Sequence, residues 1–166
     1  MPRLIKDRAI IDDTWQLLRP ASDGALPELP AQGDLIVPLA LWQAQREALL
    51  THKSKFGVWL APNDEPENIA TDLDKLTVIA VDFPQFTDGR GYSIARLLRE
   101  RYKFAGELRA IGDVLCDQLF YMQRCGFNAF AVREDKNIQD ALKALDDFSE
   151  TYQVSVEQPQ PLFRRR

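Results

Sequence analysis

The loop FPQFTDGRGYS contains the residues of this sequence best suited to binding chemistry. Gly89 and Gly91 precede an amphipathic segment, so free backbone N–H groups at the start of a helix could bind an anion there. Arg90 adds a planar guanidinium that can donate two parallel hydrogen bonds to an oxyanion. Sulfate, sulfite, phosphate or a carboxylate would fit. The same sequence also suits a tight turn capped by Asp88 or Ser93.

A second group of polar residues stands near the ends of apolar runs. Asp82, Asp113 and Arg133 belong to it. Carboxylate and guanidinium groups that converge can orient a polar ligand or exchange protons with it, and they can equally form a structural ion pair. Tyr92 is a further proton donor, although a half-buried tyrosine commonly only packs and satisfies its hydroxyl. The candidate catalytic residues are therefore Asp82, Asp113 and Tyr92.

The residues that we assign to anion binding lie in the Gly-rich loop or near the strand ends. They are Asp88, Gly89, Arg90, Gly91, Ser93, Arg109, Gly112 and Arg133. Arg109 stands between Leu108 and Ala110 in an apolar run, and a buried guanidinium without a partner is costly. We expect it to pair, for example with Asp82 or Asp113, or to face a wet cavity.

The composition offers few residues that could bind a metal ion or form a disulfide. The sequence holds one histidine, His52, and two cysteines, Cys116 and Cys125, without a CxxC or HExxH motif, so we expect no metal site. On one helix the two thiols would lie on opposite faces, separated by a rise of about 13 Å, too far for a disulfide. Cys116, in the first turn, is the better candidate for a thiolate.

Five short apolar runs alternate with amphipathic stretches after residue 34. The runs cover 35–39, 57–61, 77–83, 107–112 and 129–133, and each one precedes a segment with helical periodicity or a loop. This pattern predicts five βα units with a mainly parallel sheet and right-handed crossovers. We expect a single α/β domain over 1–166. It comprises an N-terminal hairpin and Pro-rich loop (1–34), βα repeats (35–150) and a C-terminal tail (151–166).

The alternation of side chains along the strands favours one architecture. Ile79, Val81 and Phe83 share a bulky apolar face, whereas the opposite face, with Ala80 and Asp82, is small and partly charged. A central strand of an open doubly wound sheet is normally apolar on both faces, while a barrel interior or cleft admits charged groups. The chain is too short for a full eight-unit barrel. We therefore expect a partial (β/α) barrel, with the open doubly wound sheet as the alternative.

Composition excludes several classes of protein. Of the 166 residues 45% are hydrophobic, and 21 basic against 25 acidic residues give a net charge of −4, which disfavours general nucleic-acid binding. Without a signal sequence or membrane span, we expect a cytoplasmic location.

A partial barrel exposes strand edges, which favours a homodimer. The tail, with Leu162, Phe163 and three final arginines, suits contact with an acidic partner.

Several motifs resemble a known family. FTDGRGYS, ARLLRERY, F-x-GELRA-x-GDVL, DQ, M-x-RCGF and AF-x-x-R are similar to segments of the domain of unknown function (DUF) 934 family of bacterial proteins. Its members are labelled oxidoreductases of sulfite reduction. The resemblance implies a role in assimilatory sulfur metabolism, beside the sirohaem and iron–sulfur enzyme sulfite reductase. The resemblance identifies no established catalytic residues in this sequence.

These observations lead to three functional hypotheses. The first is an accessory or small-anion-binding protein of assimilatory sulfate or sulfite reduction that acts beside sulfite reductase. The second is an oxidoreductase of sulfite reduction with a bound flavin or nicotinamide. GRGYSIA lacks the third glycine of a dinucleotide fingerprint, so the sequence identifies no cofactor. The third is a small lyase-like or isomerase-like enzyme on a partial barrel, and whether the chain is an enzyme stays open.

Overall fold

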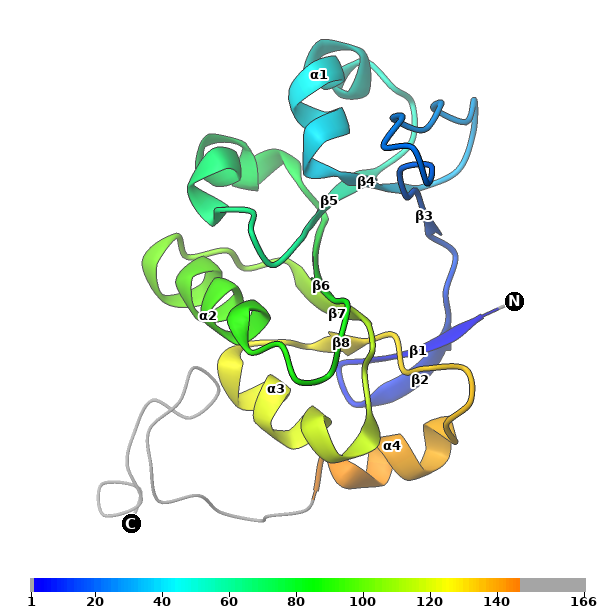
Figure 1. Ribbon diagram of the computed structural model, residues 1–166, viewed down its shortest axis with the longest axis vertical. Helices are drawn as coiled ribbons and strands as arrows, with labels where there is room; N and C mark the ends of the chain where they lie inside the picture. The colour runs from blue at the N-terminus through cyan, green and yellow to red at the C-terminus, as the bar shows by residue number, and fades with distance from the viewer. Residues whose placement is uncertain (1, 147–166) are drawn as a thin grey trace.

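One eight-stranded sheet forms the centre of the computed structural model, which describes residues 2–146. Its strands are β1 (Arg3–Lys6), β2 (Ala9–Asp12), β3 (Gln16–Leu17), β4 (Leu35–Pro38), β5 (Phe56–Leu60), β6 (Val78–Phe83), β7 (Glu107–Gly112) and β8 (Ala129–Phe130). The strand order is β2-β1-β8-β7-β6-β5-β4-β3 (Figure 1). Neighbouring strands from β3 to β8 pair parallel, and β1 pairs antiparallel with both β2 and β8. The mainly parallel α/β sheet matches the sequence-based prediction.

Helical segments lie along one side of the sheet (Figure 1); all but the last, which follows β8, connect parallel strands. They are α1 (Leu39–Leu50), the 3-10 segment η1 (Pro66–Lys75), α2 (Arg90–Arg96), the π-helical segment η2 (Leu97–Arg101), the 3-10 turn η3 (Cys116–Gln118), α3 (Leu119–Cys125) and α4 (Ile138–Ala144). Gly126 ends α3 with a φ of 116°, a left-handed conformation that glycine adopts without steric cost.

Chain connectivity shows how strongly the sheet curls. β2 and β3 occupy opposite edges of the sheet, yet only residues 13–15 join them. A flat sheet of eight strands would hold its edges about 34 Å apart. Four residue steps from Asp12 to Gln16 span at most about 14 Å. The sheet therefore bends into a half-barrel, and residues 13–15 pass between its two edges, as the partial-barrel prediction required.

Two apolar clusters fill the two sides of this half-barrel. The larger cluster packs the sheet against the helices and includes Ile79, Val81 and Phe83. The smaller one lies on the concave side and joins Ala80 to Trp15 from the segment between β2 and β3. The alternation of bulky and small faces along the strands is thus confirmed. It is residues 13–15 that cover the concave side.

The expected N-terminal hairpin is formed by β1 and β2. Asp7 and Arg8 adopt positive φ values of 49° and 65° and reverse the chain between the two strands in two residues. The segment TWQLLRP supplies β3 at the far edge of the sheet. β8 ends at Phe130, three residues before the predicted end of that strand. The predicted tail over 151–166 lies outside the described residues.

Asp72 in η1 predicts an acid-sensitive step in stability. Its carboxylate is buried and accepts hydrogen bonds from Trp42 Nε1 (3.1 Å) and from Arg46 Nη2 (2.6 Å). The Arg46 hydrogen bonds lead the interactions that lower the pKa of Asp72 from 3.8 to about 2. Because the folded-state pKa is depressed, the stabilisation is complete above the unfolded pKa and is lost as pH falls from 3.8 through about 2.

We expect Asp72→Asn to lower the free energy of unfolding at pH 7 by about 1–2 kcal/mol, a value reduced by solvent screening of the half-exposed Arg46. Urea titrations of both proteins at pH 7 and at pH 3 measure the effect. The difference between them should shrink at the lower pH. A difference that stays constant between these pH values would contradict the assignment.

Candidate functional site

A cavity of about 680 Å³ opens at the carboxyl edge of the parallel strands. This is the edge where α/β proteins of this kind place their ligands. Its lining comes from the ends of β6 and β7 and from the segments that follow β3 and β8. The lining residues are Arg19, Asp82, Phe83, Pro84, Gly112, Asp113 and Arg133. Four of the predicted site residues, Asp82, Gly112, Asp113 and Arg133, therefore meet here.

One side of the cavity carries an ion pair between Arg19 and Asp82. Arg19 Nη2 donates to Asp82 Oδ1 at 3.0 Å, and the Arg19 guanidinium lies over the Trp59 ring, 5.1 Å from its centroid. The Trp59 indole N–H in turn donates to the Leu18 carbonyl at 2.9 Å. These contacts hold a guanidinium of fixed orientation on the cavity wall. Sequence analysis did not identify Arg19, since its segment pairs with the sheet only through β3.

The other side carries Asp113 and Arg133. Arg133 Nη1 donates to Asp113 Oδ1 at 2.8 Å, while its Nη2 donates to Asp135 Oδ2 at 2.8 Å. Hydrogen bonds to Asp135 and to Asp113 raise the pKa of the Arg133 guanidinium, which keeps it charged. Asp113 Oδ2 also accepts the backbone N–H of Phe86 at 2.8 Å, so it ties the β6–α2 loop to the site. Arg133 itself is 40% exposed.

Gly112 lets the two sides approach each other. Its φ is 91°, a left-handed conformation that favours glycine. A Cβ atom at this position would overlap the Phe83 carbonyl oxygen and lie 2.7 Å from Asp82 Oδ1. The absence of a side chain therefore keeps the Asp82 carboxylate accessible from the cavity.

Phe83 and Pro84, at the start of the Gly-rich loop, line this cavity, whereas the residues from Asp88 to Ser93 do not. Arg90 Nη2 donates to Asp88 Oδ2 at 2.7 Å, and Arg90 Nη1 donates to Asn63 Oδ1. Asp88 Oδ1 accepts the Arg90 backbone N–H at 3.1 Å, and the hydrogen bonds from Arg90 lower the pKa of Asp88. The loop is thus a turn capped by Asp88. Anion binding by Asp88, Gly89, Arg90, Gly91 and Ser93 stays a prediction.

Arg109 is buried on the concave side of the sheet, away from the cavity lining. Its guanidinium is 3% exposed and donates to Glu107 Oε1 at 2.8 Å and to both Asp13 carboxylate oxygens at 3.1 Å. Lys6 adds a second cation to Glu107 at 3.1 Å. The expected pairing partners, Asp82 and Asp113, are therefore replaced by Glu107 and Asp13. Asp13 comes from the segment that passes between the sheet edges, which local sequence patterns do not place.

Tyr92 and the two cysteines lie on the helix side of the sheet. Tyr92 packs against Phe83 and Tyr121, with ring centroids 5.2 and 4.9 Å away, and burial raises the pKa of its hydroxyl. It stands apart from the other two candidate catalytic residues. Burial also raises the pKa of the Cys125 thiol, as expected for an unreactive cysteine. Both Cys116 and Cys125 are free thiols.

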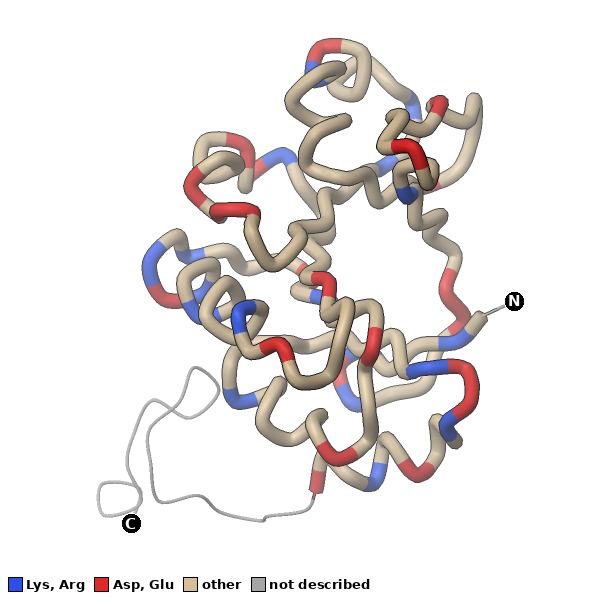
Figure 2. Tube along the Cα trace, in the orientation of Figure 1, with Lys and Arg blue, Asp and Glu red and all other residues tan. Residues whose placement is uncertain are grey.

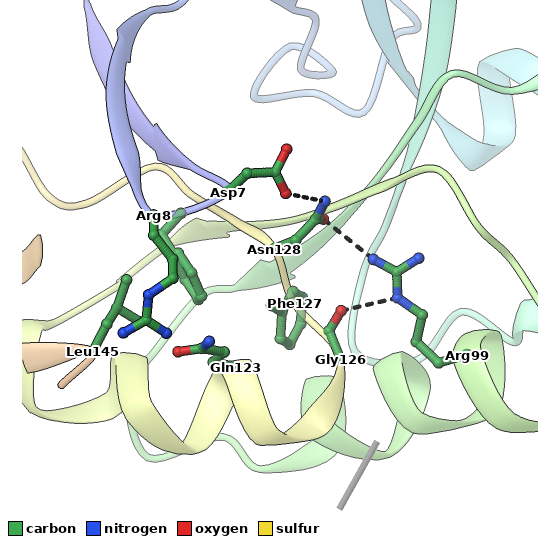
Figure 3. Close-up of a pocket in the computed structure, with 9 residues that line it drawn as sticks. Asp7, Arg8, Arg99, Gln123, Gly126, Phe127, Asn128 and Leu145 are labelled. Carbon is green, nitrogen blue, oxygen red and sulfur yellow. Dashed lines mark hydrogen bonds between the residues drawn. The ribbon is translucent and has the colours of Figure 1, made fainter. Parts of the chain in front are cut away.

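A second, more apolar cavity lies at the opposite, amino edge of the sheet (Figure 3). It has a volume of about 430 Å³, and Phe127, Phe130 and Leu145 supply its apolar lining. Asn128 links its polar groups, because its side chain donates to Asp7 Oδ1 at 3.1 Å and accepts from Arg99 Nη2 at 3.2 Å. The sequence analysis predicted no site at this edge.

Charge is mixed along the whole described chain, with acidic and basic residues interspersed (Figure 2). Within residues 2–146, no group of three or more His, Cys, Asp or Glu residues is placed to hold a metal ion. No helix in that range is long and apolar enough to cross a membrane.

A search of the curated proteins found no match to the chain. A family model described as "Bacterial protein of unknown function (DUF934)" matches residues 57–163. The matched region begins in β5 and includes Asp82, Asp113 and Arg133, while Arg19 precedes it. The chain thus belongs to the DUF934 family of bacterial proteins.

Proposed function

We propose that this protein binds a small anionic ligand at the carboxyl edge of its sheet. The observation that carries the proposal is the pair of guanidiniums, Arg19 and Arg133, that line one cavity while remaining 45% and 40% exposed. Asp82 and Asp113 hold them in place, so little side-chain entropy is lost when a ligand arrives. Guanidiniums donate strong, planar hydrogen bonds to oxyanions.

The biological setting that we propose is assimilatory sulfate or sulfite reduction. The label attached to the DUF934 family supports this setting, and sulfite is an oxyanion that a guanidinium recognises. In this proposal the protein is a cytoplasmic accessory protein that acts beside sulfite reductase, and it forms a homodimer. Light scattering on the purified protein tests the homodimer.

Anion-dependent thermal stabilisation tests the binding site. We expect sulfite, sulfate or phosphate to raise the melting temperature in a concentration-dependent manner, because a ligand that binds only the folded state stabilises it. Arg133→Gln should abolish most of this response, since it removes a guanidinium from the cavity wall. The matched control is Arg90→Gln, which removes an arginine that is likewise half-exposed and paired with an aspartate two residues away.

The two variants separate the two candidate anion sites. A response lost in Arg133→Gln and kept in Arg90→Gln supports the cavity. The reverse pattern would move the site to the Gly-rich loop. A wild-type protein that responds to none of the three anions would overturn the proposed function.

A further inference from the structure

A third cavity adjoins the carboxyl-edge site and shares Arg133 with it. It has a volume of about 360 Å³, and its lining includes Arg3 at the start of β1 and Lys136 in the segment after β8. β1 runs antiparallel to β8, so the beginning of β1 lies at the same edge as the end of β8. The Arg133 guanidinium therefore stands between two cavities at one edge of the sheet.

The two cavities differ in charge. The smaller one is lined by three cations, Arg3, Arg133 and Lys136, and by two carboxylates, Asp13 and Glu134. Arg133 and Lys136 also pair with Asp135, which does not line the cavity. The Asp13 carboxylate is already engaged by the buried Arg109. Within residues 2–146, no hydrogen bond or ion pair engages the Arg3 side chain. An anion placed in the smaller cavity would therefore meet a free guanidinium.

The larger cavity has a different character. Its two arginines are each paired with a carboxylate, Asp82 or Asp113, so a ligand there meets hydrogen-bond acceptors beside the guanidiniums. Carboxylates accept hydrogen bonds from hydroxyl groups, as they do from ribose in many nucleotide-binding proteins. With a volume of about 680 Å³ it is wide open to solvent. It can therefore accommodate a hydroxyl-bearing body beside an anionic group that contacts Arg133.

We infer, building on the proposed function, that the ligand is a tetrahedral oxyanion ester with a hydroxyl-bearing body, as in a sugar phosphate. Its anionic group contacts Arg133, as in the proposed function, and extends into the smaller cavity toward Arg3 and Lys136. Its hydroxyl groups donate to Asp82 and Asp113 in the larger cavity. Arg133 contacts the ligand where the two parts join.

Binding measurements with inorganic phosphate, ribose and ribose 5-phosphate test this assignment. By isothermal titration calorimetry, we expect ribose 5-phosphate to bind at least tenfold more tightly than either of the other two. Arg3→Gln should weaken phosphate and ribose 5-phosphate alike, by fivefold or more. Asp82→Asn should weaken ribose 5-phosphate toward the affinity of phosphate and leave phosphate itself unweakened. The control is Arg96→Gln, which alters an exposed arginine paired with Glu100 on the helix side.

The outcomes distinguish this inference from the proposed function. If phosphate binds in an Arg133-dependent manner and ribose 5-phosphate binds no more tightly, the anion site stands and the ester assignment fails. If neither phosphate nor ribose 5-phosphate binds, both fail. An Arg3→Gln protein with unchanged affinity for both would also overturn the placement of the anionic group. Arg3 is exposed, and the melting temperature of the variant checks that it folds.

Discussion

Arg109→Met is expected to lower the free energy of unfolding by about 3–5 kcal/mol, the usual cost of removing one partner from a buried ion pair. The guanidinium is 3% exposed and bridges Glu107 in β7 to Asp13 between the sheet edges. Its loss leaves the buried Glu107 carboxylate with Lys6 alone and releases the segment that covers the concave side. Urea denaturation at pH 7 measures the loss directly.

The same variant separates a structural role of Arg109 from a binding role. Because Arg109 does not line the carboxyl-edge cavity, the anion-dependent rise in melting temperature should persist in Arg109→Met. Arg96→Met is the control, since Arg96 is half-exposed and pairs with the exposed Glu100 at 3.4 Å. It should change stability by no more than about 0.5 kcal/mol. A protein that keeps wild-type stability and loses the anion response would restore the original assignment of Arg109 to binding.

Arg99→Met is expected to destabilise the protein by about 3–4 kcal/mol, because three backbone carbonyls would each lose a hydrogen bond from a charged donor. Arg99 donates to the Gly126 carbonyl at 2.9 Å and to the Phe104 and Gly106 carbonyls at 2.8 Å each. It also reaches Asn128 Oδ1, which orders the turn into β8 (Figure 3). Burial lowers the pKa of this guanidinium, a sign of its desolvation.

Two further variants test whether geometry or charge explains the effect of Arg99. Lysine keeps the charge but cannot reproduce the planar fork of donors, so Arg99→Lys should recover less than half of the lost stability. Arg101→Met, at an exposed position two residues away, should leave the urea midpoint nearly unchanged. Full stability in Arg99→Lys would show that the charge alone suffices and that the four hydrogen bonds contribute little.

Features that depend on local residue patterns could be predicted from the sequence alone. The period-two alternation in VIAVDF separates the side of the sheet that packs against helices from the concave side, because successive strand residues point to opposite faces. Gly126 ends α3 because a left-handed residue is needed directly after the helix. Asp82, Asp113 and Arg133 could be assigned to one edge of the sheet because parallel strands place their carboxyl ends together.

Contacts between distant segments were decided only by the tertiary structure. Arg19 reaches Asp82, and Asp13 reaches Arg109, because β3 pairs with β4 at one edge while the hairpin pairs with β8 at the other. No local pattern of residues specifies a pairing between strands so far apart in the sequence, and the two-residue β3 has almost no periodic signal. The curl of the whole sheet brings these edges close together, and so determines which charged groups are buried and which line the cavity.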